Sequence, residues 1–226
     1  CSVKTGKPVA TDAMEPIRTG HTVNAMNLRH VVITSVDRDD IKNDYGAEIW
    51  AETIEQIRIQ APECTIEVLT PDFRNYASAF EKVFKAEPDI FSHNIECVER
   101  ISRQVRPQSD WNRSLSVLQA SIEWGLKTKT GMMVGLGEND SEVLETMQEI
   151  AELGITIFNI GQYLQPTLNH LPVQRFVHPD IFKMYKERGL EMGFRVVESG
   201  PLVRSSYHAD EQARKHEDIF IIEDLG

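Results

Sequence analysis

The sequence has little cysteine, no long hydrophobic run and no excess of positive charge. Its three cysteines, Cys1, Cys64 and Cys97, are too few and too scattered for a disulfide framework, so a reducing compartment is expected. No apolar run approaches the roughly 18 residues that a membrane span needs. Asp and Glu number 35 against 24 Lys and Arg, and this net charge of −11 argues against non-specific binding to nucleic acid or to an anionic membrane.

Flexible linkers, low-complexity segments and targeting patterns are also missing from the 226 residues. A length of this order suits one large domain or two small ones. Because the chain begins with Cys rather than Met, we interpret it as a fragment, or as the ordered part of a longer protein. We expect a cytoplasmic location, while an organellar targeting signal upstream of residue 1 stays open.

Short apolar runs alternate with amphipathic stretches along most of the chain, as in a β–α repeat. Strands are expected at residues 29–36, 64–69, 89–93, 127–134, 155–160 and 194–197. Helices are expected at residues 45–60, 76–85, 98–105, 111–124, 139–153 and 179–192. The pattern predicts a parallel α/β domain, either an open doubly wound sheet or a full or partial (β/α) barrel. Both architectures place ligand sites at the carboxyl ends of the strands.

Polar side chains follow the first and third expected strands. Ser35 and Asp37 come after the first strand, and they suit either an amine or hydroxyl-rich ligand or a solvated loop with a helix cap. Asn94 and Glu96 follow the third strand, where an amide that both donates and accepts hydrogen bonds suits a ribose or a carboxylate. Arg106 either pairs with a ligand carboxylate or caps the helix before a proline.

The fourth strand leads into a glycine-rich segment, residues 131–138, that reads GMMVGLGE. Glycines there let a flat ligand approach the backbone, although their spacing is not that of a Rossmann fingerprint. Glu67 interrupts an apolar strand; because an unpaired buried carboxylate is costly, it either faces a polar barrel interior or lies on an edge. Gln165 follows the fifth strand, and the polar run 204–208 follows the last, where exposure to solvent is the ordinary expectation.

Taken together, these segments resemble one family, the lipoyl synthases of the radical S-adenosylmethionine (SAM) superfamily. The matching strings are CSVKTGKP, HVVITSVDRDD, EVLTPDFR, HNIE, VRP, TKTGMMVGLGE, IGQYLQP, HLPVQRF and GPLVRSSYHADEQA. They run in family order from residue 1 to about residue 213, and the last 13 residues carry no match. The resemblance implies a partial (β/α)6 TIM-type barrel of parallel strands over residues 1–200, followed by a C-terminal extension, residues 201–226, that carries the RSSY motif.

The resemblance also implies an activity and its cofactors. A 4Fe–4S cluster at the barrel mouth binds SAM and cleaves it reductively, and the resulting radical abstracts hydrogens from C6 and C8 of a protein-bound octanoyl chain. A second, auxiliary 4Fe–4S cluster donates the two sulfur atoms. Thiolate ligation that leaves one iron open suits this chemistry, because the open iron takes the amino and carboxylate groups of SAM.

Residue by residue, the resemblance carries cluster ligands to two positions. Cys1 stands where the family has the third cysteine of its C-x-x-x-C-x-x-C triplet. The other ligands of that cluster, and three cysteines of the auxiliary cluster, would lie upstream. The fourth auxiliary ligand is a serine of RSSY, which we assign to Ser205 in preference to Ser206. Arg204 would sit near that cluster and help to control loss of the serine, a hard and labile iron ligand.

The resemblance further implies a SAM pocket drawn from the strand ends. Its expected members are Ser35, Asp37, Asn94, Glu96, Arg106, Lys129, Gly135, Glu138 and Gln165. Tyr45 departs from the family pattern, because it stands in place of a glycine in a loop that is one residue longer here. Cys97 lacks ligand spacing, and Cys64 is expected to be a small buried hydrophobe. With so few cluster cysteines, the 226 residues alone are expected to be inactive.

Three other functions compete with this interpretation. The chain could be another radical-SAM sulfur-insertion enzyme that resembles biotin synthase, a metal-free barrel lyase or isomerase with Lys129 as a Schiff-base residue, or a degenerate SAM-binding barrel without catalysis. The family implies an octanoylated lipoyl carrier domain, an electron donor such as flavodoxin or ferredoxin, and an iron–sulfur carrier as partners, with neither nucleic acid nor membrane. Because the net charge is −11, docking of an acidic carrier needs a local positive patch, for which the candidates are Lys4, Lys7, Arg18 and Arg38.

Overall fold

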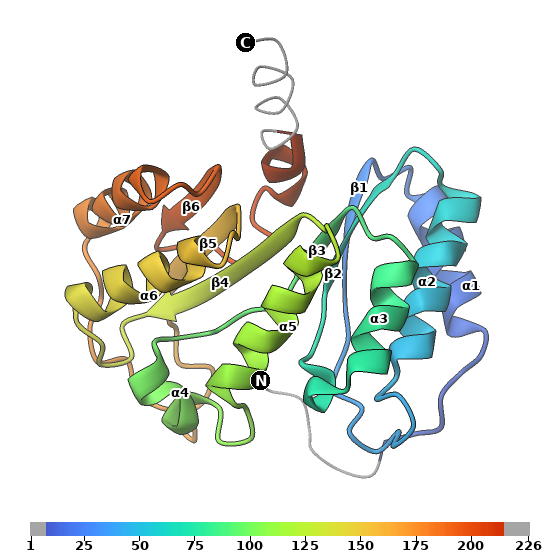
Figure 1. Cartoon of the computed structure of the whole chain (residues 1–226), viewed down its shortest axis with the longest axis horizontal. Coiled ribbons are helices and arrows are strands. Elements are labelled where there is room, and N and C mark those ends of the chain that lie inside the picture. The colour runs from blue at the N-terminus through green and yellow to red at the C-terminus, as the bar shows by residue number, and fades with distance from the viewer. Residues whose placement is uncertain (1–7, 215–226) are drawn as a thin grey trace.

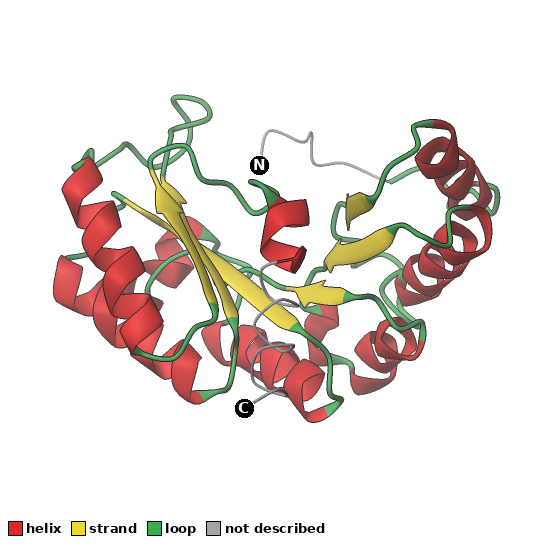
Figure 2. Cartoon of the chain, turned by 90° about the horizontal axis from the view of Figure 1, so that it is seen from above, coloured by secondary structure: helices red, strands yellow, loops and turns green. Residues whose placement is uncertain are grey.

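The computed structural model describes residues 8–214 as a curved sheet of parallel strands with helices on its convex side (Figure 1). The six strands are hydrogen-bonded in chain order from β1 to β6, and every pair is parallel. In the described part of the chain the first and last strands do not pair, so the sheet is an open barrel with a concave side (Figure 2). This confirms the predicted partial (β/α)6 barrel.

The elements lie close to the predicted ranges. The strands are β1 (His30–Thr34), β2 (Thr65–Leu69), β3 (Ile90–Ser92), β4 (Thr128–Val134), β5 (Ile157–Gln162) and β6 (Val196–Gly200). The helices are α1 (Glu15–Ala25), α2 (Ala47–Gln60), the 3-10 helix η1 (Phe73–Asn75), α3 (Ala77–Lys85), α4 (Glu99–Val105), α5 (Trp111–Glu123), α6 (Asp140–Glu152) and α7 (Pro179–Glu191). The sequence did not predict α1, because only Pro16, Gly20 and Val23 on that helix are buried.

Successive residues of each strand face two different environments, as the period of a β-strand requires. On β2, Ile66 and Val68 face outward and pack in an apolar cluster with residues of α2 and α3, such as Ile54 and Phe80. On β5, Phe158 and Ile160 belong to a second cluster with residues of α6 and α7. These two clusters attach the helices to the convex side and leave the alternate side chains on the concave side.

A buried ion pair lies on the concave side. The ammonium nitrogen of Lys129 on β4 lies 2.9 Å from Oε1 of Glu67 on β2, and the side chains are 1% and 0% exposed. Nε2 of His30 lies 3.8 Å from the same carboxylate, through Oε2. Burial raises the pKa of Glu67 and lowers that of Lys129, and in each case the partner's charge opposes the effect of burial. The expectation that Glu67 faces a polar barrel interior is confirmed.

The segment after β6 fills much of the remaining concave side. The chain turns back at Gly200, and residues 209–214 form a helical turn that runs into the grey trace in Figure 1. Ala213 packs in a small cluster with Ile90, Ile157 and Val196, which are the first residues of β3, β5 and β6. The segment 201–214 therefore crosses the barrel interior from the carboxyl ends of the strands to their amino ends.

The two cysteines within the described residues are core residues. Cys64 is 2% exposed and packs in the cluster behind β2, as the sequence predicted. Cys97 is 1% exposed, and burial raises the pKa of its thiol to about 12, which disfavours the thiolate that a metal ligand requires. Cys1, the expected cluster ligand, lies outside the described residues.

Across residues 8–214, no helix combines the length and the apolar character that crossing a membrane demands.

Replacing Lys129 by Met should strongly destabilise the fold, because it strands the Glu67 carboxylate in the barrel interior. Breaking a buried pair in this way costs about 3–5 kcal/mol of unfolding free energy. Burial raises the pKa of Glu67, and loss of the Lys129 charge should raise this pKa further. The loss of stability should therefore be complete well above that pKa, and it should shrink as the pH falls through it and the carboxyl is protonated. Urea unfolding at two pH values measures both effects.

The matched variants are Glu67→Leu with Lys129→Met, and Lys85→Met on the exposed surface of α3. The double variant should recover most of the lost stability, because an apolar pair leaves no charge unpaired. The surface variant should stay within about 0.5 kcal/mol of the wild type. A Lys129→Met protein as stable as the surface variant at neutral pH would contradict the analysis.

Candidate functional site

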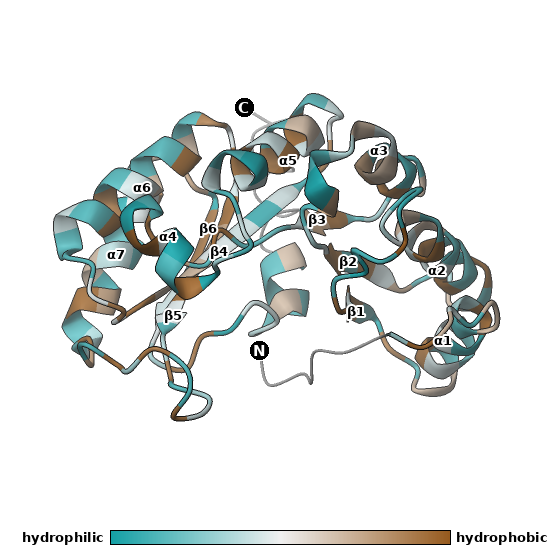
Figure 3. Ribbon diagram, turned by 90° about the horizontal axis from the view of Figure 1, so that it is seen from below, coloured by the Kyte–Doolittle hydropathy of each residue, from teal (hydrophilic) through white to brown (hydrophobic). Residues whose placement is uncertain are grey.

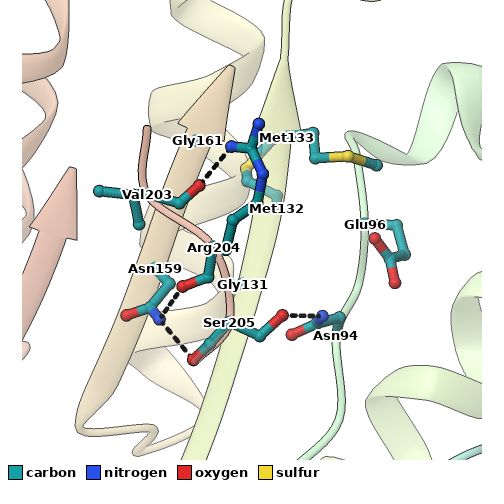
Figure 4. Close-up of a pocket in the computed structure, with 10 residues that line it drawn as sticks. All are labelled: Asn94, Glu96, Gly131, Met132, Met133, Asn159, Gly161, Val203, Arg204 and Ser205. Carbon is teal, nitrogen blue, oxygen red and sulfur yellow. Dashed lines mark hydrogen bonds between the residues drawn. The ribbon is translucent and has the colours of Figure 1, made fainter. Parts of the chain in front are cut away.

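A small pocket lies on the concave side of the sheet, where the segment after β6 meets β4 and β5 (Figure 4). Asn94 and Glu96 form one wall, and the stretch Gly131–Met133 of β4 forms another. Asn159 and Gly161 of β5 face the stretch Val203–Ser205. The cavity volume is about 80 Å³. The structure thus brings together four of the expected site residues, Asn94, Glu96, Arg204 and Ser205.

The absence of a side chain at Gly161 lets the segment after β6 lie directly against β5. A Cβ atom at this position would lie 2.2 Å from the carbonyl oxygen of Val203 and 3.3 Å from Nη1 of Arg204. Real Cβ atoms do not approach backbone so closely, so any larger residue would push the segment away. The glycine that follows ITIFNI in the sequence therefore has a packing role in the site.

Two asparagine side chains hold the segment over the pocket. Nδ2 of Asn159 donates hydrogen bonds to the carbonyl oxygens of Arg204, at 3.3 Å, and Ser205, at 3.1 Å. Nδ2 of Asn94 donates to the hydroxyl oxygen of Ser205 at 3.1 Å. Ser205 is thus held through its backbone by β5 and through its side chain by the loop after β3 (Figure 4).

The two serines of the motif differ in their surroundings. The hydroxyl of Ser205 is half-buried and accepts the hydrogen bond from Asn94. Ser206 is exposed, and within residues 8–214 its hydroxyl makes no hydrogen bond. The guanidinium of Arg204 donates to the carbonyl oxygen of Val203 at 2.6 Å, and it pairs with no carboxylate in the same part of the chain. Arg204 Nη1 also donates to the carbonyl oxygen of Pro201, at 3.5 Å, so its hydrogen-bond partners within residues 8–214 are all backbone carbonyls.

The wall beside Asn94 contains a carboxylate and a guanidinium. Nη1 of Arg106 lies 3.6 Å from Oε1 of Glu96. Burial raises the pKa of Glu96, while Arg106 and a hydrogen bond from Asn94 oppose that rise. The backbone of Glu96 accepts from Met133 at 2.8 Å and donates to Gly131 at 3.1 Å, which fixes this residue beside β4. Arg106 does not line the pocket, and its contact with a ligand stays a prediction.

Four other expected cofactor contacts lie away from the pocket lining. Ser35 and Asp37 are exposed in the loop after β1, and the Ser35 hydroxyl donates to the carbonyl oxygen of Val36. Lys129 is held in the ion pair with Glu67. Gln165 donates to the carbonyl oxygen of His170 at 2.8 Å, in the loop after β5. Their roles toward a cofactor stay predictions.

Gly135 and Glu138, also expected at the cofactor, shape the loop after β4. The carboxylate of Glu138 accepts from the backbone amide of Gly135 at 2.6 Å and from that of Leu136 at 2.9 Å. Gly135 has a φ of +99°, and a Cβ atom there would lie 2.3 Å from Nε2 of Gln162. Both residues are needed to turn the chain into α6, and neither lines the pocket. Their contact with a cofactor stays a prediction.

The loops after β1 and β2 are joined at the same end of the sheet. Nε of Arg74 donates to Oδ2 of Asp39 at 2.8 Å. Tyr45, which replaces a glycine of the family pattern, takes a left-handed φ of +55°. Phe73, Arg74 and Asn75 have φ values of 44°, 54° and 57°, a conformation that is uncommon for residues with side chains. The DRDD and PDFR strings therefore form one cross-linked rim.

The expected positive patch is only partly described. Lys4 and Lys7 lie outside the described residues. Arg18 lies 2.7 Å from Asp12, and Arg38 lies 2.8 Å from Asp40. Because each arginine is already paired with a carboxylate, these two residues offer less positive charge to an acidic partner than the sequence predicted. The docking role of the patch stays a prediction.

Residues 8–214 fit SAM in chemistry, and by themselves they offer only a minority of the ligands that an iron–sulfur cluster needs. Asn94 and Glu96 present an amide and a carboxylate, and the buried Oδ1 of Asn159 has no hydrogen-bond partner among residues 8–214. A cavity of about 80 Å³ holds only part of a molecule that size, because ligand pockets usually measure about 300–1,000 Å³. Within the same residues, no group of three or more His, Cys, Asp or Glu side chains could hold a metal ion.

The sequence reasoning missed the role of Asn159 in this site. Asn159 is a polar residue within the apolar run ITIFNI. A polar side chain inside a buried strand is costly unless it has a hydrogen-bond partner, and this cost was the available signal. The partners, however, are backbone carbonyls 45 and 46 positions away, which no local pattern reveals.

Replacing Glu138 by Gln should destabilise the protein in the absence of any cofactor, because its carboxylate accepts two backbone hydrogen bonds in a buried loop. Hydrogen bonds to a charged group contribute about 1.5–3 kcal/mol, and an amide can accept only with its single oxygen. Urea unfolding checks this, with Glu145→Gln on the exposed side of α6 as control. Equal stability of the two variants would assign Glu138 to ligand binding rather than to the loop.

Known proteins match both the sequence and the fold. The sequence profile of the Radical SAM superfamily matches residues 1–150. A lipoyl synthase of Rubrobacter xylanophilus is 53% identical over 214 residues, which cover 94% of this chain and 66% of that protein. A lipoyl synthase of Flavobacterium psychrophilum is 50% identical over 210 residues, covering 92% of this chain and 72% of that protein. The chain thus spans about two thirds to three quarters of the length of these relatives.

Solved structures share the fold at low sequence identity. The Streptococcus suis protein SuiB, bound to its precursor peptide SuiA, has a TM-score of 0.65 and 11% identity over 88% of this chain and 45% of that chain. Methylornithine synthase has a TM-score of 0.56 and 13% identity over 86% of this chain and 64% of that chain. These likenesses concern the barrel alone, whereas the sequence matches extend through the RSSY segment. The chain belongs to the lipoyl synthase family of the radical SAM superfamily.

Proposed function

We propose that the protein is a lipoyl synthase that inserts two sulfur atoms, at C6 and C8, into a protein-bound octanoyl group by SAM-dependent radical chemistry. The observation that carries the proposal is the position of the RSSY segment. Arg204 and Ser205 lie inside the barrel, at a pocket lined by the β4 backbone, Asn94 and Glu96. A barrel that only cleaved SAM would not require a serine and the Arg204 guanidinium there.

When bound, a reduced 4Fe–4S cluster supplies the electron that cleaves SAM, and an auxiliary 4Fe–4S cluster supplies the sulfur. The residues of this chain have simpler tasks. Asn94 and Glu96 donate to and accept from the polar groups of SAM, and the stretch Gly131–Met133 lines the same pocket. The Ser205 hydroxyl provides an oxygen ligand at the pocket, and Arg204 places a positive charge beside it.

The remaining cofactor ligands and the partners are further parts of the proposal. The family resemblance assigns Cys1 to the SAM-binding cluster and places five more cysteines upstream of it. An octanoylated lipoyl carrier domain is the proposed substrate, with flavodoxin or ferredoxin as electron donor and an iron–sulfur carrier for cluster supply. We propose a cytoplasmic location, and we expect neither nucleic acid nor a membrane to be a partner.

The competing functions are separated by the surroundings of particular residues. A Schiff-base lyase would use Lys129, but this side chain is 1% exposed and paired with Glu67, so a carbonyl substrate has no access to it. Another radical-SAM sulfur-insertion enzyme would share the barrel but would not need the RSSY segment. A SAM-binding barrel without catalysis is compatible with the small cavity, and only an assay of product decides against it.

The activity is tested with an octanoyl-lysine peptide, incubated anaerobically with SAM, a reductant and the reconstituted protein in a form that carries the upstream cysteines. Mass spectrometry should detect a product with two added sulfur atoms, formed through an intermediate with one. The 226-residue chain alone is the matched control and should give no product. Release of 5′-deoxyadenosine without sulfur addition would mean that the enzyme acts on a different substrate. A protein that carries its clusters but does not cleave SAM would contradict the proposal.

The serine ligand is tested by Ser205→Ala and Ser206→Ala in the same protein. Ser205→Ala should lower the yield of the two-sulfur product at least a hundredfold, because its oxygen is the proposed ligand of the auxiliary cluster that supplies the sulfur. SAM cleavage should continue. Ser206→Ala should retain most of the activity, because its hydroxyl is exposed and makes no hydrogen bond within the described range. Iron and sulfide content of both variants is the second readout, and the reverse pattern would assign the ligand to Ser206.

A further inference from the structure

Asn159 is a buried polar residue for which the proposed chemistry has no direct use. It lies in the middle of β5 and faces the concave side, between Ile157 and Gly161. Its side chain is almost fully buried, with 4% of the residue exposed. Burying an amide costs free energy unless it makes hydrogen bonds. The hydrogen-bond partners of this side chain therefore indicate its role.

The donor atom of Asn159 is shared by two consecutive backbone carbonyls. Nδ2 donates to the carbonyl oxygen of Arg204 and to that of Ser205, at 3.3 Å and 3.1 Å. Both contacts are to backbone, so neither occupies the Arg204 guanidinium or the Ser205 hydroxyl. An interaction of this kind fixes the backbone of Arg204 and Ser205, and it leaves their guanidinium and hydroxyl groups free of Asn159.

The neighbouring contacts complete this restraint. Gly161, two residues along β5, has room for the Val203 carbonyl only because it lacks a side chain. Asn94 donates to the Ser205 hydroxyl from the opposite wall of the pocket. Together β5 and the loop after β3 hold Val203, Arg204 and Ser205 from two sides (Figure 4).

We propose that Asn159 is a positioning residue: by holding the carbonyls of Arg204 and Ser205 against β5, it keeps the serine oxygen and the guanidinium aimed into the pocket. The identity of Ser205 as a cluster ligand rests on the proposed function. The restraint itself rests on the hydrogen bonds of this chain, so the two can be tested separately.

The segment has a second attachment that does not involve Asn159. Ala213 packs against the first residues of β3, β5 and β6, and Gln212 is fully buried at the same end. Between the two attachments, Ser206, Tyr207 and His208 are exposed. Loss of the Asn159 contacts should therefore release the part that carries Arg204 and Ser205, while the helical turn 209–214 stays in place.

Hydrogen–deuterium exchange of the Asn159→Leu variant tests this division. Leu has nearly the shape of Asn but cannot donate, so the change removes the hydrogen bonds without opening a cavity. The amides of Val203 and Tyr207 are hydrogen-bonded to Gly200 and Arg204, which makes their exchange a measure of order in the segment. Their exchange should become roughly tenfold faster, the effect of losing hydrogen bonds that contribute about 1.4 kcal/mol together.

Peptides covering residues 209–214 should exchange within about twofold of the wild-type rate, and the melting temperature should change by no more than about 4 °C. Asn159→Ala should give the same result. The control variant Asn24→Ala, on the exposed surface of α1, should change the exchange neither at Val203 and Tyr207 nor in residues 209–214. Unchanged exchange at Val203 and Tyr207 would overturn the proposal. Faster exchange across the whole barrel with a large fall in melting temperature would also overturn it, because Asn159 would then be a general stability residue.

The cofactor-loaded protein separates this inference from the proposed function. With Asn159→Leu, the amount of two-sulfur product formed per 5′-deoxyadenosine released should fall at least tenfold. A segment that loosens by exchange, with product formation unchanged, would support Asn159 as the positioning residue and contradict the assigned role of Ser205. A segment that does not loosen would contradict the positioning role, whatever the activity.

Discussion

The concave side of an open six-stranded sheet cannot be left empty, and the rest of this structure depends on how it is filled. Beyond the apolar cluster at the amino ends, the inward side chains are too small or too polar to make an apolar core: Gly131, Asn159 and Gly161 line one part, and Glu67 and Lys129 occupy another. The chain supplies the missing volume itself, by leading the segment after β6 back through the interior. Gly161, which leaves part of that space, also lets the backbone of Val203 enter it, so the fold and the site share one cause.

The interior changes in character along the strands. Near the amino ends, Ala213 closes an apolar cluster with Ile90, Ile157 and Val196. The Glu67–Lys129 pair follows, where water is excluded and each charge depends on the other. The pocket comes next, with two amides, a carboxylate and the Arg204 guanidinium. The apolar cluster and the buried ion pair thus lie between the amino ends of the strands and the pocket. Their packing holds in place the strands that carry the pocket residues.

The sequence predicted the architecture because each strand and its helix follow a local pattern. Runs such as TIEVL and ITIFNI are buried on the side that faces the helices, and the caps at Asn139 and the glycine after α7 mark helix ends locally. Helix α1 was not predicted, because it buries small residues against α2 and has no broad apolar face.

The site was predicted less completely, for a physical reason. The residues that the sequence selected include Asn94, Glu96, Arg204 and Ser205, which do lie together. The same reasoning also selected Lys129, Gln165 and Glu138, which do not line the pocket. Those three satisfy their polar groups within the chain, through an ion pair, a loop carbonyl and two backbone amides. Whether a polar residue near a strand end serves a ligand or the fold depends on partners distant in sequence, which a local pattern does not contain.

The geometry of the pocket also links its size to the motif that forms its wall. At about 80 Å³ the cavity is bounded on one side by Val203, Arg204 and Ser205, which are held by hydrogen bonds and by the contact with Gly161 rather than by a large apolar surface. Each such hydrogen bond contributes only about 0.5–1.5 kcal/mol, so this wall can move at a cost far below that of opening the sheet. Displacing it would enlarge the pocket and move the serine oxygen in the same step. The serine position and the space available to a ligand are therefore coupled through one short segment, which Asn159 and Gly161 hold from β5 and Asn94 holds from the loop after β3.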